Sequence, residues 1–395
     1  MNKKTLRDID VDGKRVLVRV DFNVPLDKDT REILDDTRIR AALPTIEYLR
    51  QHRARTILVS HLGRPDGMVV EKSRLAPVAK RLSELLGADV PCATDVVGPS
   101  ADATVAALPP GGVAMLENVR FEPGEEANDP AFARKLASYA DVYVNDAFGT
   151  AHRAHASTAG VAQYLPAVAG FLMEKEIDYL GRVTSDPERP VAAIIGGAKI
   201  SSKIGVLRHL LSKVETLLIG GGMASTFMKA QGLDVGASLV EDDQLETARE
   251  IVDEAKRRGV ALGLPCDVVI GDRFAADAQS RIVGAAEVPD GWLILDLGPR
   301  TVQDYEAKLQ GARTVVWNGP LGVAEWDAFA QGSQELARFL AKSGATVVIG
   351  GGETLALVTE LGLAPAYAHV STGGGASLEF LEGRELPGVA ALQDR

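Results

Sequence analysis

Short apolar runs alternate with amphipathic helical stretches along the chain, and this alternation limits the fold more than any other feature. The runs typical of strands are residues 15–20, 56–60, 113–116 and 142–144 in the first half, and 191–195, 216–219, 268–270, 314–317, 346–349 and 369–370 in the second. Strands that alternate with helices predict parallel sheets, because a parallel connection needs a crossover that is usually a helix. Since 395 residues exceed what one hydrophobic core usually supports, we expect an α/β protein with two doubly wound, Rossmann-like parallel-sheet domains.

Residues 170–190 separate the two halves and predict an amphipathic helix. Its apolar residues recur at helical spacing, at Met173, Ile177, Leu180 and Val183. Pro187 and Pro190 end the pattern, because proline cannot continue a helix. A crossover helix inside one domain would give the same pattern. The chemistry of the strand ends differs between the halves, however, and this difference favours a helix that joins two domains.

Polar and basic residues follow the strands of the first half. The set comprises Asp21, Asn23, Arg38, His61, Arg64, Arg120 and Arg153. Ligands of parallel sheets bind at the carboxyl ends of the strands, so these residues are expected to converge on one crevice. Arginine presents a planar fork that suits phosphate and carboxylate oxygens, and the predicted ligand is a small, multiply anionic molecule. Each arginine alone is typical of a solvated surface ion pair, but four at strand ends or helix starts favour a binding site.

Two local predictions accompany this pattern. Of the histidines, only His61 is expected to contact the ligand, and the others are expected to hold turns. A helix is expected from about residue 36, and Pro44 is expected to divide it into two pieces.

Glycines, not arginines, follow the strands of the second half. They occur in the groups 196–197, 220–222, 350–352 and 373–375. Glycine lets backbone N–H groups approach a ligand closely, and a helix that begins there points its positive end at an anion. One such turn is weak support, because tight strand-to-helix packing explains it as well, but several in one half predict a nucleotide phosphate surface. Lys199 and Lys203 are expected on one face of the first turn of a helix, within reach of a phosphoryl group.

Composition excludes several classes of function. The net charge of −11 argues against a nucleic-acid surface or binding to an acidic membrane. The sequence has no run of about 18 apolar residues and no apolar segment after its basic start, so we expect a cytoplasmic protein. Cys92 and Cys266 lie far apart, without a second cysteine or a histidine at metal-ligand spacing, and both are expected to be buried thiols.

An arginine-lined crevice, a glycine-lined crevice and a joining helix together indicate a hinge-closing phosphotransferase. Closure would exclude the water that otherwise hydrolyses the phosphoryl donor. No Asp or His of the first half is evidently placed as a general base. An acceptor carboxylate would need none, because it is already ionised.

These motifs resemble those of the phosphoglycerate kinase family. The matching stretches are 19–25 (RVDFNVP), 36–39 (DTRI), 61–65 (HLGRP), 117–121 (ENVRF), 145–149 (NDAFG), 151–155 (AHRAH), 196–199 (GGAK), 317–320 (WNGP) and 371–375 (STGGG). The resemblance runs in order over about residues 19–383. It implies reversible phosphoryl transfer between ATP and the carboxylate of 3-phosphoglycerate, giving ADP and 1,3-bisphosphoglycerate, with Mg²⁺ on the nucleotide. It also implies a monomer.

The resemblance further implies roles for individual residues. The phosphoglycerate contacts would be Asp21, Asn23, Arg38, His61, Arg64, Arg120 and Arg153, with Arg38 beside the reacting carboxylate. The transferring group and the nucleotide phosphates would meet Lys199, Lys203 and the backbone N–H groups of Gly373 and Gly374. The nucleotide would also contact Asn318, Pro320, Glu325, Gly351, Gly352, Glu353 and Thr354, with Glu325 on the ribose. The expected domains are 1–170 with about 379–395 for phosphoglycerate, 171–189 for the hinge helix and 190–378 for the nucleotide.

Two residues depart from the family pattern. Glu353 stands where the family commonly has Asp, which is the expected protein contact to the metal, and we expect Glu353 to reach Mg²⁺ through a water. Ile294 stands where the family usually has glycine beside the adenine pocket, which bears on nucleotide affinity and preference.

Three other functions fit part of the sequence. A two-lobed solute-binding protein would share the arginine crevice, but it normally needs export and has no use for Lys199 and Lys203. A dehydrogenase or nucleotide-binding regulator would fit the glycines, yet the sequence contains neither G-x-G-x-x-G nor G-x-x-x-x-G-K-[ST], and the arginines would have no role. Another small-molecule kinase is the closest rival, and substrate competition would separate the two.

Overall fold

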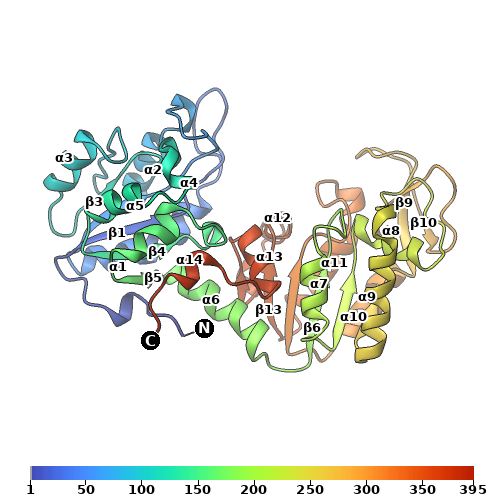
Figure 1. Cartoon of the computed structure of the whole chain (residues 1–395). Helices are drawn as coiled ribbons and strands as arrows, with labels where there is room; N and C mark the ends of the chain where they lie inside the picture. The colour runs from blue at the N-terminus through green and yellow to red at the C-terminus, as the bar shows by residue number, and fades with distance from the viewer. Residues whose placement is uncertain (1) are drawn as a thin grey trace. The chain divides into compact units, whose positions relative to one another are not determined.

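The computed structural model describes residues 2–395 (Figure 1). The chain forms two compact units. The first runs to Asp178 and includes Glu385–Arg395, and the second spans Tyr179–Arg384. Each unit contains a parallel sheet with helices around it, so the predicted fold class of two doubly wound α/β domains is confirmed.

Five parallel strands form the sheet of the first unit, in the order β3-β2-β1-β4-β5. The strands are β1 Arg15–Val20, β2 Arg55–Val59, β3 Val113–Met115, β4 Val142–Asp146 and β5 Ala167–Ala169. The helices are α1 Thr37–Gln51, α2 Ala76–Leu86, α3 Pro99–Ala107, α4 Pro123–Glu126, α5 Pro130–Ala137 and α14 Pro387–Ala390. The chain order reverses between β1 and β4, and ligands of open parallel sheets bind at such a switch point.

The central strand β1 is buried on both faces, as parallel strands usually are. Val16, Val18 and Val20 pack into the core that α1 and α2 cover. Since side chains alternate along a strand, Arg19 points to the opposite face, where only 1% of it is exposed.

Helix α1 is continuous through Pro44, so the predicted division at this proline is wrong. Proline in a helix interior removes one hydrogen bond and strains the preceding turn. Here Ile39, Ile46 and Leu49 on the same helix are fully buried in the core, and this packing outweighs the local penalty.

The two ends of the chain meet in the first unit. Lys4 N–H donates to the Gln393 carbonyl at 2.8 Å, and Gln393 N–H donates to the Ala167 carbonyl at 3.0 Å. Figure 1 accordingly shows the N and C labels close together. The predicted return of the C-terminal segment to the N-terminal domain is thus confirmed.

Helix α6 (Phe171–Ser185) forms where the amphipathic pattern predicts a helix, and it ends before Pro187. The apolar residues of the pattern are buried. At its start, Asp146 Oδ1 accepts the N–H groups of Leu172 and Met173 at 2.9 and 3.2 Å. The end of β4 therefore fixes the first turn of α6.

Six parallel strands form the main sheet of the second unit, in the order β14-β13-β12-β6-β7-β8. The strands are β6 Val191–Ile195, β7 Thr216–Ile219, β8 Ala261–Gly263, β12 Thr314–Asn318, β13 Thr346–Gly350 and β14 His369–Val370. The helices are α7 Ile204–Leu210, α8 Gly222–Ala230, α9 Leu245–Arg258, α10 Pro299–Leu309, α11 Gln331–Leu340, α12 Gly352–Glu360 and α13 Gly375–Leu381.

A small antiparallel sheet in the second unit corrects one sequence prediction. Its strands are β9 Asp267–Gly271, β10 Ser280–Gly284 and β11 Leu293–Leu297, in the order β10-β9-β11. We expected residues 268–270 to belong to the series of strands that alternate with helices. No helix separates β9, β10 and β11 within the described chain, and β10 and β11 pair antiparallel with opposite edges of β9.

The two cysteines differ in exposure. Cys92 is partly buried but Cys266 is exposed, so the prediction of two buried thiols is wrong for Cys266, which lies in the loop before β9.

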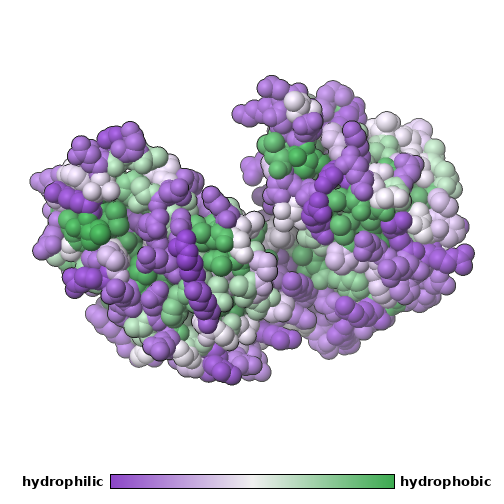
Figure 2. Space-filling model, turned by 180° about the vertical axis from the view of Figure 1, so that it is seen from behind, coloured by the Kyte–Doolittle hydropathy of each residue, from purple (hydrophilic) through white to green (hydrophobic). Residues whose placement is uncertain are grey.

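Hydrophilic side chains cover most of the face seen in Figure 2, and hydrophobic residues show in separate patches. Among residues 2–395, no helix has the length and apolar character needed to cross a membrane.

Candidate functional site

In the first unit, the residues predicted to bind a small anion follow adjacent strands at one edge of the sheet. The strand registers align the ends of β1, β2, β3 and β4. Asp21 and Asn23 follow β1, His61 follows β2, and Arg120 lies in the short helix η3 (Val119–Phe121) that follows β3. The predicted convergence therefore has a direct cause in the topology.

Arg38 lies in the first turn of α1 and reaches back to the loop after β1. Its Nη1 donates a hydrogen bond of 2.9 Å to Asp21 Oδ2. The Arg38 side chain is 38% exposed, whereas that of Asp21 is 12% exposed. A guanidinium has five N–H donors, so Arg38 can hold Asp21 and an anionic ligand at the same time.

The loop after β2 is held from two sides by predicted site residues. Asn23 Oδ1 accepts the N–H of Gly63 at 2.9 Å, and Arg120 Nη1 donates to the Gly63 carbonyl at 2.9 Å. Gly63 has a φ of +66°, a left-handed conformation that glycine adopts without strain. Arg64, the next residue, is exposed.

Cations are concentrated around Arg120. Burial lowers the pKa of the Arg120 guanidinium, Glu126 opposes this shift, and Arg19 and Arg153 add to it. Arg153 itself is exposed. Several positive charges close enough to perturb one another favour the binding of an anion at this edge of the sheet.

His61 is buried at the same place and faces these cations. Burial holds its pKa well below the usual value, and Arg19, Arg120 and Arg38 lower it further. The imidazole is therefore neutral at pH 7. Its Nδ1 lies 3.9 Å from Asp21 Oδ1, which is beyond normal hydrogen-bond length.

Sequence reasoning missed three buried polar residues of this unit, Arg19, Glu125 and Ser157. Arg19 donates through Nε to Ser157 Oγ at 2.8 Å, and Ser157 Oγ donates to Glu125 Oε1 at 2.6 Å. One signal was present, namely a charged residue inside the apolar run 15–20. Its partners lie far along the chain and no local pattern marks them.

In the second unit, the predicted glycines line a cavity of about 400 Å³ at the carboxyl edge of the main sheet. The polar side chains in its wall are Ser202, Lys203, Asn318 and Glu353, and the glycines are Gly196, Gly197, Gly319, Gly351, Gly352, Gly374 and Gly375. A Cβ on Gly196 would lie 2.1 Å from the Pro320 carbonyl oxygen, so only glycine lets β6 and β12 end this close together.

Lys203 and Lys199 are placed differently from the prediction. Helix α7 begins only at Ile204, so Lys199 lies in the preceding loop and the two lysines do not share a helix face. The glycines that precede Lys199 favour an irregular turn, so the helix does not begin there. Lys203 lines the cavity, and burial lowers the pKa of its ammonium group, while Glu353 and Glu382 raise it.

Several predicted nucleotide contacts hold the cavity wall together. Thr354 is buried, and its Oγ1 accepts the N–H of Gly319 at 2.9 Å. The Pro320 carbonyl accepts the N–H of Gly197 at 3.0 Å. The N–H of Gly373 donates to Ser371 Oγ at 3.1 Å, so this predicted phosphate donor already has a partner, whereas Gly374 lines the cavity.

An adjoining cavity of about 270 Å³ is mostly apolar. Its wall includes Leu239, Phe274, Ile294, Leu295, Leu321 and Val323, with Asp296, Glu325 and Glu353 as its charged side chains. Gly197, Ala198 and Glu353 line both cavities, so the apolar and glycine-lined spaces are neighbours that share part of their walls. A flat apolar base would fit the first space and its phosphates the second.

Two residues of the apolar cavity have structural roles as well. Ile294 packs against two small apolar clusters, one around Val235 and one around Val268. Asp296 accepts the N–H groups of Leu297 and Gly332 at 2.8 and 2.9 Å, and burial raises its pKa to about 7. Both side chains therefore stabilise the wall that they line.

The donor set suits a metal ion that arrives with a nucleotide. Among residues 2–395, no three His, Cys, Asp or Glu side chains are grouped so that they could hold a metal ion by themselves. Mg²⁺ usually needs only one or two protein carboxylates when substrate phosphates supply other ligands. Glu353, at the first turn of α12 and in both cavity walls, fits that role.

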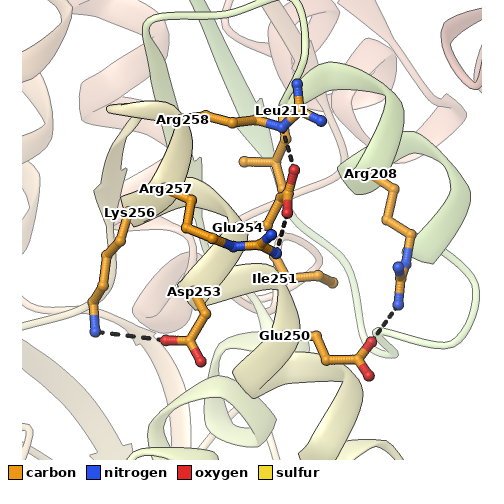
Figure 3. Close-up of a pocket in the computed structure, with 9 residues that line it drawn as sticks. All are labelled: Arg208, Leu211, Glu250, Ile251, Asp253, Glu254, Lys256, Arg257 and Arg258. Carbon is orange, nitrogen blue, oxygen red and sulfur yellow. Dashed lines mark hydrogen bonds and ion pairs between the residues drawn. The ribbon is translucent and has the colours of Figure 1, made fainter.

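A third hollow, of about 900 Å³, lies between α7 and α9 on the surface of the second unit (Figure 3). Its charged side chains are paired: Arg208 with Glu250, Lys256 with Asp253, and Arg257 and Arg258 with Glu254. Exposed pairs of this kind contribute little, and each charged side chain of this wall already has a partner of opposite charge. The hollow is therefore not a candidate site.

The chain is similar to known proteins over its whole length. A family model described as phosphoglycerate kinase matches residues 6–384. The phosphoglycerate kinase of Moorella thermoacetica is 59% identical over 395 residues, with 100% of both chains covered. The cytosolic phosphoglycerate kinase of Nicotiana tabacum is 58% identical, with 99% of this chain and 98% of that protein covered.

Solved structures give the same result. The phosphoglycerate kinase of Coxiella burnetii has a TM-score of 0.90 and 42% identity, and that of Pyrococcus horikoshii has a TM-score of 0.85 and 33% identity. In both comparisons 98% of each chain is covered.

The chain has two α/β units, each built on a parallel sheet. One unit has a cluster of cations at its sheet edge and the other a glycine-lined cavity, as in the class of two-domain α/β kinases. The chain belongs to the phosphoglycerate kinase family. It is therefore an enzyme, a phosphotransferase of glycolysis, and the resemblance of its motifs to this family is confirmed.

Proposed function

We propose that the chain transfers a phosphoryl group reversibly between ATP and the carboxylate of 3-phosphoglycerate, giving ADP and 1,3-bisphosphoglycerate. The observation that carries this proposal is the ion pair of Arg38 with Asp21 within a group of cations at the switch point of the first sheet. A ligand with a phosphate at one end and a carboxylate at the other suits such a group.

In this proposal the cations divide the acceptor between them. Arg64, Arg120 and Arg153 bind its phosphate, and Arg38 lies beside the reacting carboxylate, where it stabilises charge in the transition state. The hydroxyl group is bound by Asp21, Asn23 and His61. Support comes from the half-exposed guanidinium of Arg38 and from the positions of the other residues around Gly63.

The nucleotide is proposed to occupy the two adjoining cavities of the second unit. Its base lies in the apolar cavity, with Glu325 on the ribose. Its phosphates lie in the glycine-lined cavity beside Lys203, the backbone of Gly374, and Lys199 on the preceding loop. The contacts of Asn318 and Pro320 with Lys203 and Gly197 shape that space. Mg²⁺, when bound, neutralises phosphate charge, and Glu353 would hold it through a water.

The reaction is proposed to be an in-line transfer without a general base. A carboxylate nucleophile needs no deprotonation, and the neutral, buried His61 is the only histidine among the proposed contacts. The transferring group must be kept from water, so we propose that hinge motion at α6 brings the two substrates together.

The division of labour follows the two compact units. We propose that residues 1–170 and the C-terminal segment bind phosphoglycerate, that 190–378 bind the nucleotide, and that 171–189 form the hinge. The unit boundaries at Asp178 and Glu385 support this division. We further propose that the chain works in the cytoplasm and, as the family resemblance implies, that it is a monomer.

The test is ADP formation from Mg-ATP, with the acyl phosphate removed by a coupling enzyme because this direction is uphill. ADP is expected to appear with 3-phosphoglycerate and not with glycerol 3-phosphate, which has the phosphate and a hydroxyl but no carboxylate. Equal rates with both acceptors would contradict a carboxylate acceptor. No ADP formation with either acceptor would contradict the proposal that 3-phosphoglycerate is the substrate.

A further inference from the structure

Arg19 is a buried cation that is not among the proposed substrate contacts. It projects from β1 on the face opposite the α1 and α2 core, and only 1% of it is exposed. Arginine stays protonated inside proteins, so a buried guanidinium must be held by acceptors. Nε donates to Ser157 Oγ at 2.8 Å, and Nη1 donates to the Val20 carbonyl. The third partner is His61, whose Nδ1 lies 3.3 Å from Nη2.

Glu125 supplies the opposite charge for this buried cation. Its two carboxylate oxygens accept the hydroxyl and the N–H of Ser157, at 2.6 and 2.9 Å. Burial raises the pKa of the Glu125 carboxyl, and Arg19 opposes that rise. A continuous polar path therefore leads from Glu125 on α4 through Ser157 and Arg19 to His61.

The chemistry of the guanidinium decides the state of the histidine. A guanidinium can only donate hydrogen bonds, so the ring nitrogen that faces it must accept. Nδ1 of His61 therefore carries no proton, and the N–H of the neutral ring is on Nε2. The contacts of the ring with Arg19 and Asp21 both involve Nδ1, which leaves Nε2 for a ligand.

We propose that Arg19 is a positioning residue that fixes His61 as a neutral imidazole protonated on Nε2, so that His61 donates a hydrogen bond to the bound acceptor. The identity of the acceptor rests on the proposed function, whereas the tautomer follows from the Arg19 contacts alone. Because the unprotonated nitrogen faces Arg19, His61 cannot take a proton from the ligand. The network thereby makes His61 a donor and excludes it as a general base.

The charged and titratable groups that act on His61 keep it in this state. Arg19, Arg38, Arg120 and His155 disfavour a second proton on the ring, and Asp21 is the carboxylate nearest to it. Binding of the acceptor is therefore expected to show no titration of His61 between about pH 6 and pH 8, the range in which an ordinary histidine changes charge.

The direct test is nitrogen NMR of the full chain labelled with ¹⁵N-histidine, without substrate, at about pH 7. The chain has 6 histidines, and the signals of His61 are those that vanish in His61→Gln. We expect Nδ1 to resonate as an unprotonated nitrogen and Nε2 as a protonated one. A protonated Nδ1 overturns the proposal. Since no substrate is present, this result is independent of the proposed function.

The second test removes the donor without leaving a charge buried alone. Arg19→Met combined with Glu125→Gln takes out both charges, and Glu125→Gln alone is the matched control that keeps the Arg19 contact. In the double variant we expect mixed tautomers of His61 and a KM for 3-phosphoglycerate raised about threefold above pH 7, where the ring is neutral and part of the molecules lack the proton on Nε2. Below the pKa of the ring both nitrogens carry a proton, so the KM should fall back, and the KM for ATP should stay unchanged within about twofold. The control is expected to keep the wild-type tautomer.

The outcomes of this second test are distinct. If the double variant retains the wild-type tautomer and a flat pH profile, Arg19 is only a structural cation and the proposal fails. If neither the wild type nor the variants turn over 3-phosphoglycerate, the proposed function fails while the tautomer result stands. If the double variant does not fold, the wild-type spectrum still decides the tautomer.

Discussion

Lys203 donates a hydrogen bond of 2.5 Å from Nζ to Asn318 Oδ1, and this contact joins the residue before α7 to the last residue of β12. The ammonium group lies in the wall of the glycine-lined cavity, where burial lowers its pKa. It is thus a cation held in place before any anion arrives, which is the arrangement that stabilises charge on a transferring phosphoryl group.

Replacing Lys203 by methionine is expected to lower kcat about 100- to 1,000-fold, because a fixed positive charge next to the phosphates is lost. Methionine keeps most of the apolar stem, so the fold should be retained. The measurement is kcat from coupled ADP formation, with circular dichroism as a check of folding. Lys229→Met, which removes an exposed ion pair with Asp242, is the control and should leave kcat unchanged. An equal loss in both variants would contradict the role of Lys203.

Alanine substitutions at two glycines of the same cavity are expected to have different effects, one on stability and the other on ATP binding. A Cβ on Gly196 would lie 2.1 Å from the Pro320 carbonyl oxygen, whereas one on Gly352 would have nothing within 4 Å. Gly196→Ala should therefore lower the free energy of unfolding by about 2 kcal/mol or more. Gly352→Ala should fold normally but raise the KM for ATP, because its methyl group extends into the cavity. Thermal unfolding and KM measured on both variants test the contrast, and an unchanged KM in Gly352→Ala would contradict it.

The buried carboxyl of Asp146 is expected to make the stability of the first unit depend on pH. Burial raises the pKa of its carboxyl from 3.8 to about 6. Between these pH values the folded state binds the proton and the unfolded state does not, so this group adds stability as the pH falls from about 6 to about 4. The uncharged variant Asp146→Asn should therefore gain about 2 to 3 kcal/mol relative to wild type between pH 4 and pH 7.

Urea unfolding of both proteins across this range measures the effect. Asp141→Asn serves as a control of opposite sign, because Arg15 holds the pKa of the Asp141 carboxyl below its usual value. That variant should be less stable than wild type by a nearly constant amount above about pH 4, and the difference should shrink as the pH falls further. A difference between Asp146→Asn and wild type that does not change with pH would refute the argument for Asp146.

Much of the site could be predicted because it depends on local patterns and on topology. Apolar runs followed by polar residues mark the strand ends, and Arg38 lies in the helix that follows the loop of Asp21, so their contact needs no long-range information. The glycines were equally visible, since close approach of β6 and β12 leaves no room for a side chain at Gly196.

The remainder depends on contacts between distant segments. Nothing near Arg19 in the sequence shows that Ser157 and Glu125 would hold it. Whether the N–H of Gly373 is free or bonded depends on a side-chain rotamer of Ser371, which spacing does not define. Likewise, the loop position of Lys199 depends on where α7 begins, and helix starts are less certain than helix existence.

Glu353 is expected to set the metal requirement. If it holds Mg²⁺ through a water, Glu353→Gln should raise the Mg²⁺ concentration for half-maximal activity about tenfold at fixed ATP. Glu360→Gln, at the other end of α12, should leave it unchanged. The Mg²⁺ titration of the three proteins measures this, and identical curves would show that the nucleotide alone binds the ion.

The most direct test of the proposed reaction is kcat/KM for 3-phosphoglycerate in the wild type, in Arg38→Ala and in Arg208→Ala, whose arginine pairs with Glu250 away from both cavities. We expect ADP only when 3-phosphoglycerate is present, a loss of about 100-fold or more in Arg38→Ala, and a wild-type value in Arg208→Ala. An Arg38→Ala enzyme that keeps the wild-type kcat/KM would contradict the assignment of the acceptor site to this edge of the first sheet.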